Sequence, residues 1–261
     1  MTNIEMSEIE FEQRESVRGI FFNRPERLNA VYETVYLSLL AELKQALDDP
    51  GVHVVMLSGR GRAFCVGADL KAHKEGRTPE QKREYLAMEQ QLCRMIYSAD
   101  KPVVAAINGF AIGAGFEIAV NCPFILMSDT AEASLPEVDL GTFVGGGVTW
   151  LLPRLIGLTN ARKLLLGELG LPVGSKRWSA QSLASLGLIH RIFSHHQFIE
   201  SSWDFCLQLS RKPQQSLRQI LNITRSSLDE SYLETSDREL LAMIHCSSTD
   251  DWQQSLKGAL S

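Results

Sequence analysis

The sequence has no run of lysine and arginine residues, and none of its apolar runs is long enough to cross a membrane. Its formal net charge is −5, and residues of both signs are interspersed along the chain. A surface that follows the phosphates of a nucleic acid is therefore not expected. The amino-terminal residues are acidic and lack the basic and apolar segments of a secretion signal. We therefore expect a cytoplasmic protein that binds neither nucleic acid nor membrane.

The cysteines are few, and no two of them form a CxxC pair. Their odd number and unpaired spacing argue against a disulfide framework and against a zinc site, so we expect reduced thiols and no metal. The thiol of Cys65 lies in a segment of interest, but its sequence neighbours are apolar and would not lower its pKa. We interpret it as structural. The five positions are Cys65, Cys93, Cys122, Cys206 and Cys246.

Several motifs of familiar enzymes are also absent. The sequence contains no GxSxG motif, no GxxxxGK[ST] loop and no GxGxxG loop. No Ser-His-Asp or Cys-His arrangement stands out, because His190, His195 and His196 cluster near one predicted surface turn and His53 begins a strand. The sequence therefore predicts neither an activated serine nor a nucleotide-phosphate loop.

What the sequence does contain is an alternation of strand and helix patterns over 261 residues, enough for one large domain or two small ones. Strand, glycine-rich turn and helix follow one another twice, which predicts an α/β architecture with ligand-binding loops at one edge. Apolar periodicity predicts a β-hairpin over residues 9–22, helices over 31–47, 79–98 and 180–186, and buried strands over 53–58, 103–107 and 122–128.

The residues from His195 onward show helical spacing and no convincing strand. We therefore divide the chain into an α/β core over residues 1–194 and a helical carboxy-terminal region over residues 195–261. This region either covers its own core or docks on a neighbouring subunit.

Two glycine-rich turns follow predicted buried strands. Residues 63–70 read AFCVGADL, and residues 109–115 read GFAIGAG. Such turns leave backbone N–H groups unpaired, and a pair of amides from two turns can form an oxyanion hole. The alternative is that each turn merely connects two elements.

Two acids follow the second turn. Glu117 lies in the apolar sequence FEIAVNC, and Glu137 follows Pro136. Apolar surroundings raise the pKa of a carboxyl group because desolvation disfavours its charge, which suits a proton carrier. The alternatives are a solvated helix face for Glu117 and the amino end of a helix for Glu137. If the two acids converge, they can serve as general acid and general base.

Taken together and in order, these stretches resemble the enoyl-CoA hydratase/isomerase, or crotonase, superfamily. The resemblance runs from about Ile9 to Phe193. Its landmarks are NRPERLNA, AFCVGADLK, KPVVAAINGFAIGAGFEIAVNC, LPEVDLG and LLPRLIG. It implies a crotonase-like spiral of ββα units with a helical carboxy-terminal region, assembled into trimers or into hexamers made of two trimers.

The resemblance also implies a site for an acyl-coenzyme A thioester, with no cofactor besides the coenzyme A of the substrate. The N–H groups of Ala68 and Ala114 would hold the thioester oxygen, and Glu117 and Glu137 would be the two catalytic acids. Joint presence of both acids favours addition of water to a 2-enoyl thioester. The rest of the acyl-CoA path would be lined by Val66, Asp69, Leu70 and Lys71.

The sequence departs from the family pattern at three places. Ala114 replaces a usual glycine, Val144 replaces a usual proline, and the segment 168–178 is longer than usual. We expect the first two to touch the acyl pocket and to affect the choice of substrate. The alternatives to hydration are isomerisation or another crotonase-type reaction on a specialised acyl-CoA, and a relative that binds acyl-CoA without turnover.

Overall fold

The computed structural model describes residues 8–71, 77–167 and 177–226. It also describes single positions nearer the end of the chain, which are Asp237, Leu240, Leu241, Met243, Ile244, Ser247, Ser248 and Lys257. Residues 168–176 of the long predicted segment and Cys246 lie outside the described residues.

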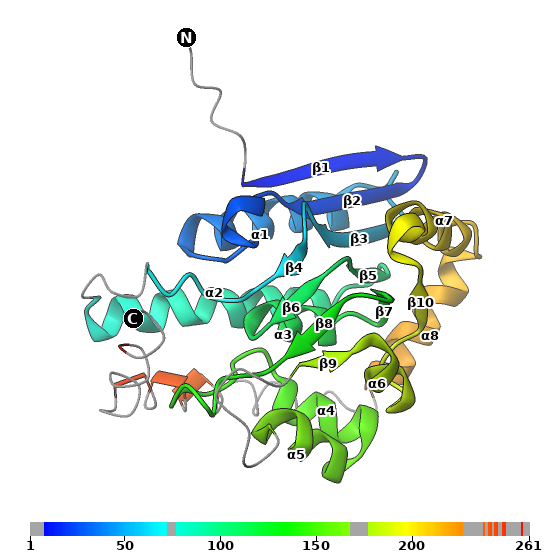
Figure 1. Ribbon diagram of the computed structural model, residues 1–261. Helices are drawn as coiled ribbons and strands as arrows, with labels where there is room; N and C mark the ends of the chain where they lie inside the picture. Colours follow the sequence, from blue (N-terminus) through cyan, green and yellow to red (C-terminus); the bar gives the residue numbers. More distant parts are fainter. Residues whose placement is uncertain are drawn as a thin grey trace.

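The larger of two sheets has six strands in the order β1-β2-β3-β5-β7-β10 (Figure 1). Its first two strands form the predicted antiparallel hairpin, and all other neighbours in this sheet pair in parallel. The strands are β1 Ile9–Arg14, β2 Val17–Phe22, β3 Val54–Gly59, β5 Val103–Ile107, β7 Phe124–Ser128 and β10 Arg191–Phe193.

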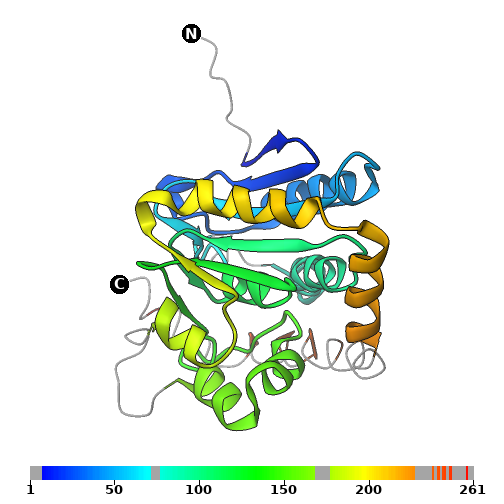
Figure 2. The same ribbon diagram turned by 90° about the vertical axis from the view of Figure 1, so that its right-hand side faces the viewer.

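Strand β3 is buried on both faces, as its unbroken apolar sequence predicts. Val55 and Leu57 belong to the main core, whereas Val54 and Met56 belong to a second apolar cluster on the opposite face. Helix α7, Phe198–Ser210, closes that second cluster with Trp203. Figure 2 shows α7 lying across this face of the sheet. The first helix of the carboxy-terminal region therefore covers the chain's own core.

The smaller sheet has four strands in the order β4-β6-β8-β9. Its strands are β4 Ala63–Cys65, β6 Phe110–Ile112, β8 Glu132–Ser134 and β9 Trp178–Ser179. The two glycine-rich stretches, interpreted from the sequence as turns alone, thus each begin with or contain a short strand. Three residues are too few to show a period of two, so the pattern could not reveal them.

The predicted helices are confirmed with small shifts at their ends. Helix α2 begins at Pro79 because Thr78 and Gln81 form a capping box, with Thr78 Oγ1 accepting a bond from the Gln81 amide. The helices are α1 Glu33–Asp48, α2 Pro79–Tyr97, α3 Ala114–Val120, α4 Val148–Ile156, α5 Leu158–Leu166, α6 Ala180–Ser185, α7 Phe198–Ser210 and α8 Gln214–Ser226.

The chain repeats a unit in which a strand of the large sheet is followed by a strand of the small sheet. This order is seen in β3-β4, β5-β6 and β7-β8. Because β4, β6 and β8 pair in parallel, their carboxyl ends lie at one edge of the small sheet. The segments that follow them, from Val66, Gly113 and Leu135, therefore meet there. No helix in the described ranges is long and apolar enough to span a bilayer.

Candidate active site

A pocket of about 430 Å³ lies at this edge of the small sheet. It gathers segments that follow all three parallel strands of that sheet, together with residues of α2. Every candidate site residue singled out from the sequence lines it, namely Val66, Ala68, Asp69, Leu70, Lys71, Ala114, Glu117 and Glu137. Their roles in binding and catalysis stay predictions.

The segment around Ala68 is held by two backbone hydrogen bonds to one residue. The Val31 amide donates to the Gly67 carbonyl at 2.8 Å, and the Asp69 amide donates to the Val31 carbonyl at 2.8 Å. In such a parallel bridge, the groups of the intervening residue point the other way. The N–H of Ala68 has no acceptor in the described part of the chain. It is available to a ligand in the pocket.

The second amide belongs to Ala114, the first residue of α3. Gly113 precedes it with φ 54°, and its amide is bound to the Ser134 carbonyl at 2.9 Å. The first N–H groups of a helix have no partner within the helix, and that of Ala114 finds none elsewhere among the described residues. A Cβ built on Gly67 would lie 3.3 Å from the Ala114 nitrogen, so the two amide-bearing segments are in close contact.

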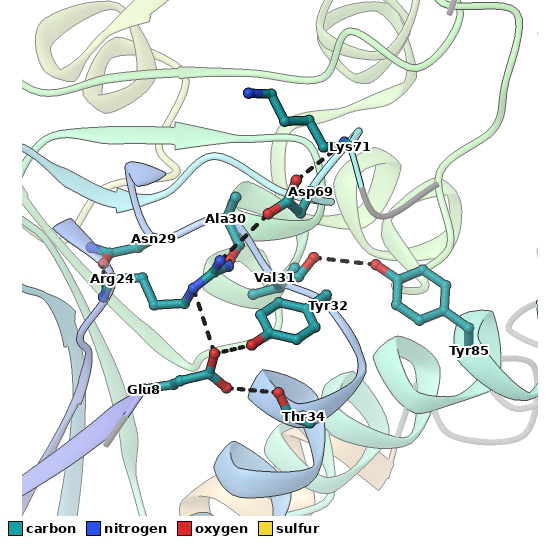
Figure 3. Close-up of polar contacts among 10 residues, drawn as sticks. All are labelled: Glu8, Arg24, Asn29, Ala30, Val31, Tyr32, Thr34, Asp69, Lys71 and Tyr85. Carbon is teal, nitrogen blue, oxygen red and sulfur yellow. Dashed lines mark hydrogen bonds and ion pairs between the residues drawn. The ribbon is translucent and has the colours of Figure 1, made fainter. Parts of the chain in front are cut away.

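Arg24 contacts both Ala30 and Asp69, which adjoin the two residues of the Val31–Ala68 bridge (Figure 3). Its Nη1 donates to the Ala30 carbonyl at 2.5 Å, and its Nη2 lies 3.5 Å from Asp69 Oδ2. Tyr85 donates its hydroxyl to the Val31 carbonyl at 3.3 Å. The sequence landmarks include Arg24 but do not reveal this role, because one of its partners, Asp69, is 45 residues away.

Glu117 lies on α3 and is 2% exposed, so the alternative of a solvated helix face is wrong. Its Oε2 accepts hydrogen bonds from the amides of Gly145 and Gly146 at 2.9 and 2.6 Å. Asn121 binds the Gly146 carbonyl through Nδ2 at 2.6 Å and so holds the same turn. Hydrogen bonds donated to a carboxylate favour its ionised form.

Glu137 has different surroundings. It follows β8 in a turn, and no helix begins there, so the alternative of a helix-terminal acid is wrong. Its side chain is buried, and Oε2 has no hydrogen-bond partner in the described ranges. Burial raises the pKa of the Glu137 carboxyl to about 8, and the charge of Glu89 adds to the rise against an opposing backbone hydrogen bond. The group therefore holds a proton near neutral pH.

The Glu137 carboxyl also touches the second amide segment. A Cβ built on Gly113 would lie 2.6 Å from Glu137 Oε1. The proton-bearing acid is thus adjacent to the residue that precedes Ala114. The lining of the pocket thus includes the unpaired amides of Ala68 and Ala114, the Glu117 carboxyl group bound by two amides, and the buried Glu137 carboxyl group.

The thiol and the imidazoles considered from the sequence are not among the residues that line the pocket. Burial raises the pKa of the Cys65 thiol to about 12, and its Sγ accepts a bond from the Gly67 amide at 3.4 Å. The side chains of His190, His195 and His196 are exposed, away from the lining of the pocket. No group of three or more metal-ligating side chains occurs among the described residues.

One residue that lines the pocket, Glu89, is not among those predicted from the sequence. It lies on α2 and is 7% exposed, and it lines the pocket with Glu117 and Glu137. Its spacing in the sequence indicates burial, because Glu89 is four residues after Tyr85 and four before Cys93, which are both buried. That spacing puts it on the core-facing stripe of the helix.

Two of the positions at which the sequence departs from the family pattern lie in the described part of the chain, and only one of them lines the pocket. Ala114 lines the pocket, as expected. Val144 is buried in the main apolar core and is not among the residues that line the pocket, so the expectation that it touches the pocket is wrong. Its neighbour Phe143 lines the pocket instead.

The chain is similar to known proteins over most of its length. A family model described as enoyl-CoA hydratase/isomerase matches residues 12–260. A crotonyl-CoA hydratase of Syntrophomonas wolfei subsp. wolfei is 28% identical over 254 residues, covering 95% of this chain and 93% of that protein. A putative enoyl-CoA hydratase of Thermus thermophilus is 34% identical over 205 residues, covering 77% of this chain and 78% of that protein.

The same fold occurs in solved structures. The crystal structure of an enoyl-CoA hydratase from Bacillus halodurans has a TM-score of 0.87 at 20% identity, covering 97% of this chain and 100% of that one. This likeness confirms the expected ββα spiral.

Proposed function

The chain belongs to the enoyl-CoA hydratase/isomerase family, and we propose on that basis that it adds water across the double bond of a 2-enoyl-CoA thioester. The observation that carries the proposal is that one pocket holds two unpaired amides and two buried acids, of which Glu117 accepts two backbone amides and Glu137 has a raised pKa. Addition of water to an enoyl thioester needs all four groups.

The amides act on the thioester oxygen. The N–H groups of Ala68 and Ala114 donate to it, and they bind it more strongly as negative charge develops in the enolate. Donors fixed before the reaction need no reorganisation, which is why an oxyanion hole of this kind lowers the barrier. The Val31 bridge and Arg24 keep the first donor in place.

The acids act on opposite ends of the double bond. Glu117, held as a carboxylate by two amides, takes a proton from water as the oxygen bonds to Cβ. Glu137, which holds a proton near neutral pH because its pKa is raised, delivers that proton to Cα as the enolate collapses. One proton is gained by Glu117 and one lost by Glu137, so a transfer through solvent restores the resting state.

Coenzyme A enters as part of the substrate, and the proposed reaction uses no further cofactor. Val66, Asp69, Leu70 and Lys71 line the path that leads from the exposed Lys71 to the two amides. A cationic side chain at the mouth suits the phosphates of coenzyme A.

The test follows the loss of conjugated absorbance from crotonyl-CoA and identifies the product. A 3-hydroxyacyl-CoA supports hydration, and a shifted double bond would replace hydration with isomerisation. Binding without turnover is the remaining alternative, and it would appear as a rise in melting temperature with acyl-CoA but no product. Absence of any product from a panel of 2-enoyl-CoAs overturns the proposal.

We also propose that the protein works in the cytoplasm as a homotrimer or as a hexamer of two trimers. The proposed assembly rests on the family resemblance. Light scattering of the purified protein gives its mass directly, and a monomer or dimer would contradict the proposed assembly.

A further inference from the structure

A residue from near the end of the chain, Met243, contributes to the wall of the pocket. The proposed reaction gives it no task. Its side chain is 4% exposed, whereas that of Leu241, at another helical position nearby, is 62% exposed. This part of the chain therefore turns Met243 toward the pocket. A methionine side chain is apolar and adapts to irregular gaps, so in a pocket wall it suits contact with a hydrocarbon chain.

Two contacts hold this part of the chain along helix α2. Arg94 forms an ion pair with Asp237, and Lys82 Nζ donates to the Ser247 carbonyl at 3.4 Å. Asp237 therefore lies near the carboxyl end of α2, and Ser247 lies near its amino end. Met243 falls between these two contacts in the sequence, so the chain is held on both sides of it.

Met243 packs against the turn that binds Glu117. A Cβ built on Gly145 would lie 1.9 Å from Met243 Sδ, so the thioether occupies the space beside that glycine. The amide of the same glycine donates to Glu117 Oε2 at 2.9 Å. Met243 and the Glu117 carboxyl group thus contact one residue of the turn, and both line the pocket.

The order of these groups gives the direction of the acyl chain. In the proposed reaction the thioester oxygen binds at the Ala114 amide and Glu117 serves Cβ. Glu117 is three residues further along α3 than Ala114, about 4.5 Å along the helix axis. A chain that continues in this direction beyond Cβ reaches the turn at Gly145 and then Met243. Only a few carbons fit between Cβ and the thioether.

We propose that Met243 closes the inner end of the acyl pocket and restricts it to short hydrocarbon chains, of hexanoyl length or less. This inference rests on the proposed function and specifies its substrate class. Each buried methylene group strengthens binding roughly fourfold until the end of the chain meets a packed side chain. A longer chain has to displace Met243 from Gly145, and the resulting strain offsets the gain.

Turnover alone is a poor test of this inference. Loss of the contact between Met243 and Gly145 also loosens the turn that donates to Glu117, so rates would change for a reason unrelated to chain length. Binding of saturated thioesters, which cannot be hydrated, isolates the recognition of the chain.

The experiment measures dissociation constants by calorimetry for butyryl-CoA, hexanoyl-CoA and octanoyl-CoA. For the wild type we expect binding to strengthen from butyryl-CoA to hexanoyl-CoA and to strengthen no further with octanoyl-CoA. Met243→Ala removes Cγ, Sδ and Cε, which leaves room for about two methylene groups. In this variant octanoyl-CoA should bind roughly tenfold more tightly than hexanoyl-CoA. Met243→Leu nearly conserves the volume and should keep the wild-type pattern.

Leu241→Ala is the matched control, because Leu241 is exposed and does not line the pocket. It should bind the three thioesters as the wild type does. A wild type that binds octanoyl-CoA more tightly than hexanoyl-CoA overturns the inference, and so does a Met243→Ala protein that binds the two equally.

If Met243→Ala does not fold, Met243→Val decides. Its smaller side chain leaves room for about one methylene group, so octanoyl-CoA should bind roughly fourfold more tightly than hexanoyl-CoA. Equal binding of the two thioesters by Met243→Val then overturns the inference. Hydration of crotonyl-CoA is measured separately on the wild type, so failure of the proposed function is recognised independently.

Discussion

Glu117 and Glu137 line the same pocket, but the regions that carry them treat a carboxyl group in opposite ways. The region of α3 and the glycine turn directs two amides at Glu117 Oε2. The turn after β8 buries Glu137 and leaves its Oε2 without a partner in the described part of the chain. Two chemically identical side chains thus have different surroundings, because two amides bind one oxygen of Glu117 whereas burial raises the pKa of Glu137.

The largest effect should come from removing either acid. Glu117→Gln and Glu137→Gln should each lower kcat for hydration by roughly a hundredfold or more, because each removes one proton-transfer group. Initial rates with crotonyl-CoA measure the loss, in a preparation whose wild type is active. Near-complete activity in both variants would show that the assignment of acid and base is wrong.

A smaller loss should follow from displacing the acids without changing them. A Cβ on Gly113 meets Glu137 Oε1 at 2.6 Å, and one on Gly146 meets Glu117 Cβ at 3.0 Å. Gly113→Ala and Gly146→Ala should each reduce kcat by roughly 10- to 100-fold, since a misplaced group loses much of its catalytic effect.

Gly187→Ala is the control for these two variants. Gly187 has a positive φ of 82° but no atom within 4 Å of a built Cβ, so it tests backbone strain away from the site. Its activity should match that of the wild type at a temperature where the protein stays folded. Equal losses in all three variants would mean that strain, not displacement, explains the result.

The pH dependence of the rate should separate the two acids. Burial raises the pKa of Glu137 to about 8, so the acid is protonated below that pH and loses its proton above it. We expect kcat/KM to fall about tenfold per pH unit above pH 8. Glu137→Gln should lack this alkaline limb in its residual activity. An alkaline limb unchanged in that variant would assign it to another group.

A separate effect should appear in the pH dependence of folding. The folded-state pKa of Glu137 lies above its ordinary value of 4.5, so the folded protein binds this proton more tightly than the unfolded chain. Its stabilising contribution is complete below pH 4.5 and is lost as pH rises to about 8, by on the order of 1 kcal/mol per pH unit. Urea unfolding at several pH values should show a flatter curve for Glu137→Gln. Parallel curves would contradict the raised pKa.

Much of the fold could be predicted from local pattern. The hairpin, α1, α2 and the buried strands β3, β5 and β7 have clear periodicity or clear boundaries, and the structure confirms them. The strands of the small sheet have two or three residues each, so their pairing depends on partners distant in the chain. The sequence could not reveal them for that reason.

Likewise, only part of the candidate site could be predicted from the sequence. Family motifs pointed to Ala68, Ala114, Glu117 and Glu137 as candidates, and the structure brings these four residues to one pocket. The motifs did not identify Glu89 as a residue of the pocket, and they did not show that Arg24 contacts Asp69. The partners of these two side chains lie on other elements. Arg24 reaches Asp69, 45 residues away, and Glu89 accepts its bond from Tyr36, 53 residues away.

The sequence by itself determined the family, the order of the repeating units and the presence of two acids beside glycine-rich turns. It also suggested, from the apolar neighbours of Glu117, that this carboxyl group would suit a proton carrier. Only the tertiary structure shows that burial raises the pKa of Glu137 and that Glu117 receives two amides from a turn 28 and 29 residues away. The protonation of a buried acid depends on the donors that surround it in space, and neighbours in sequence do not specify them.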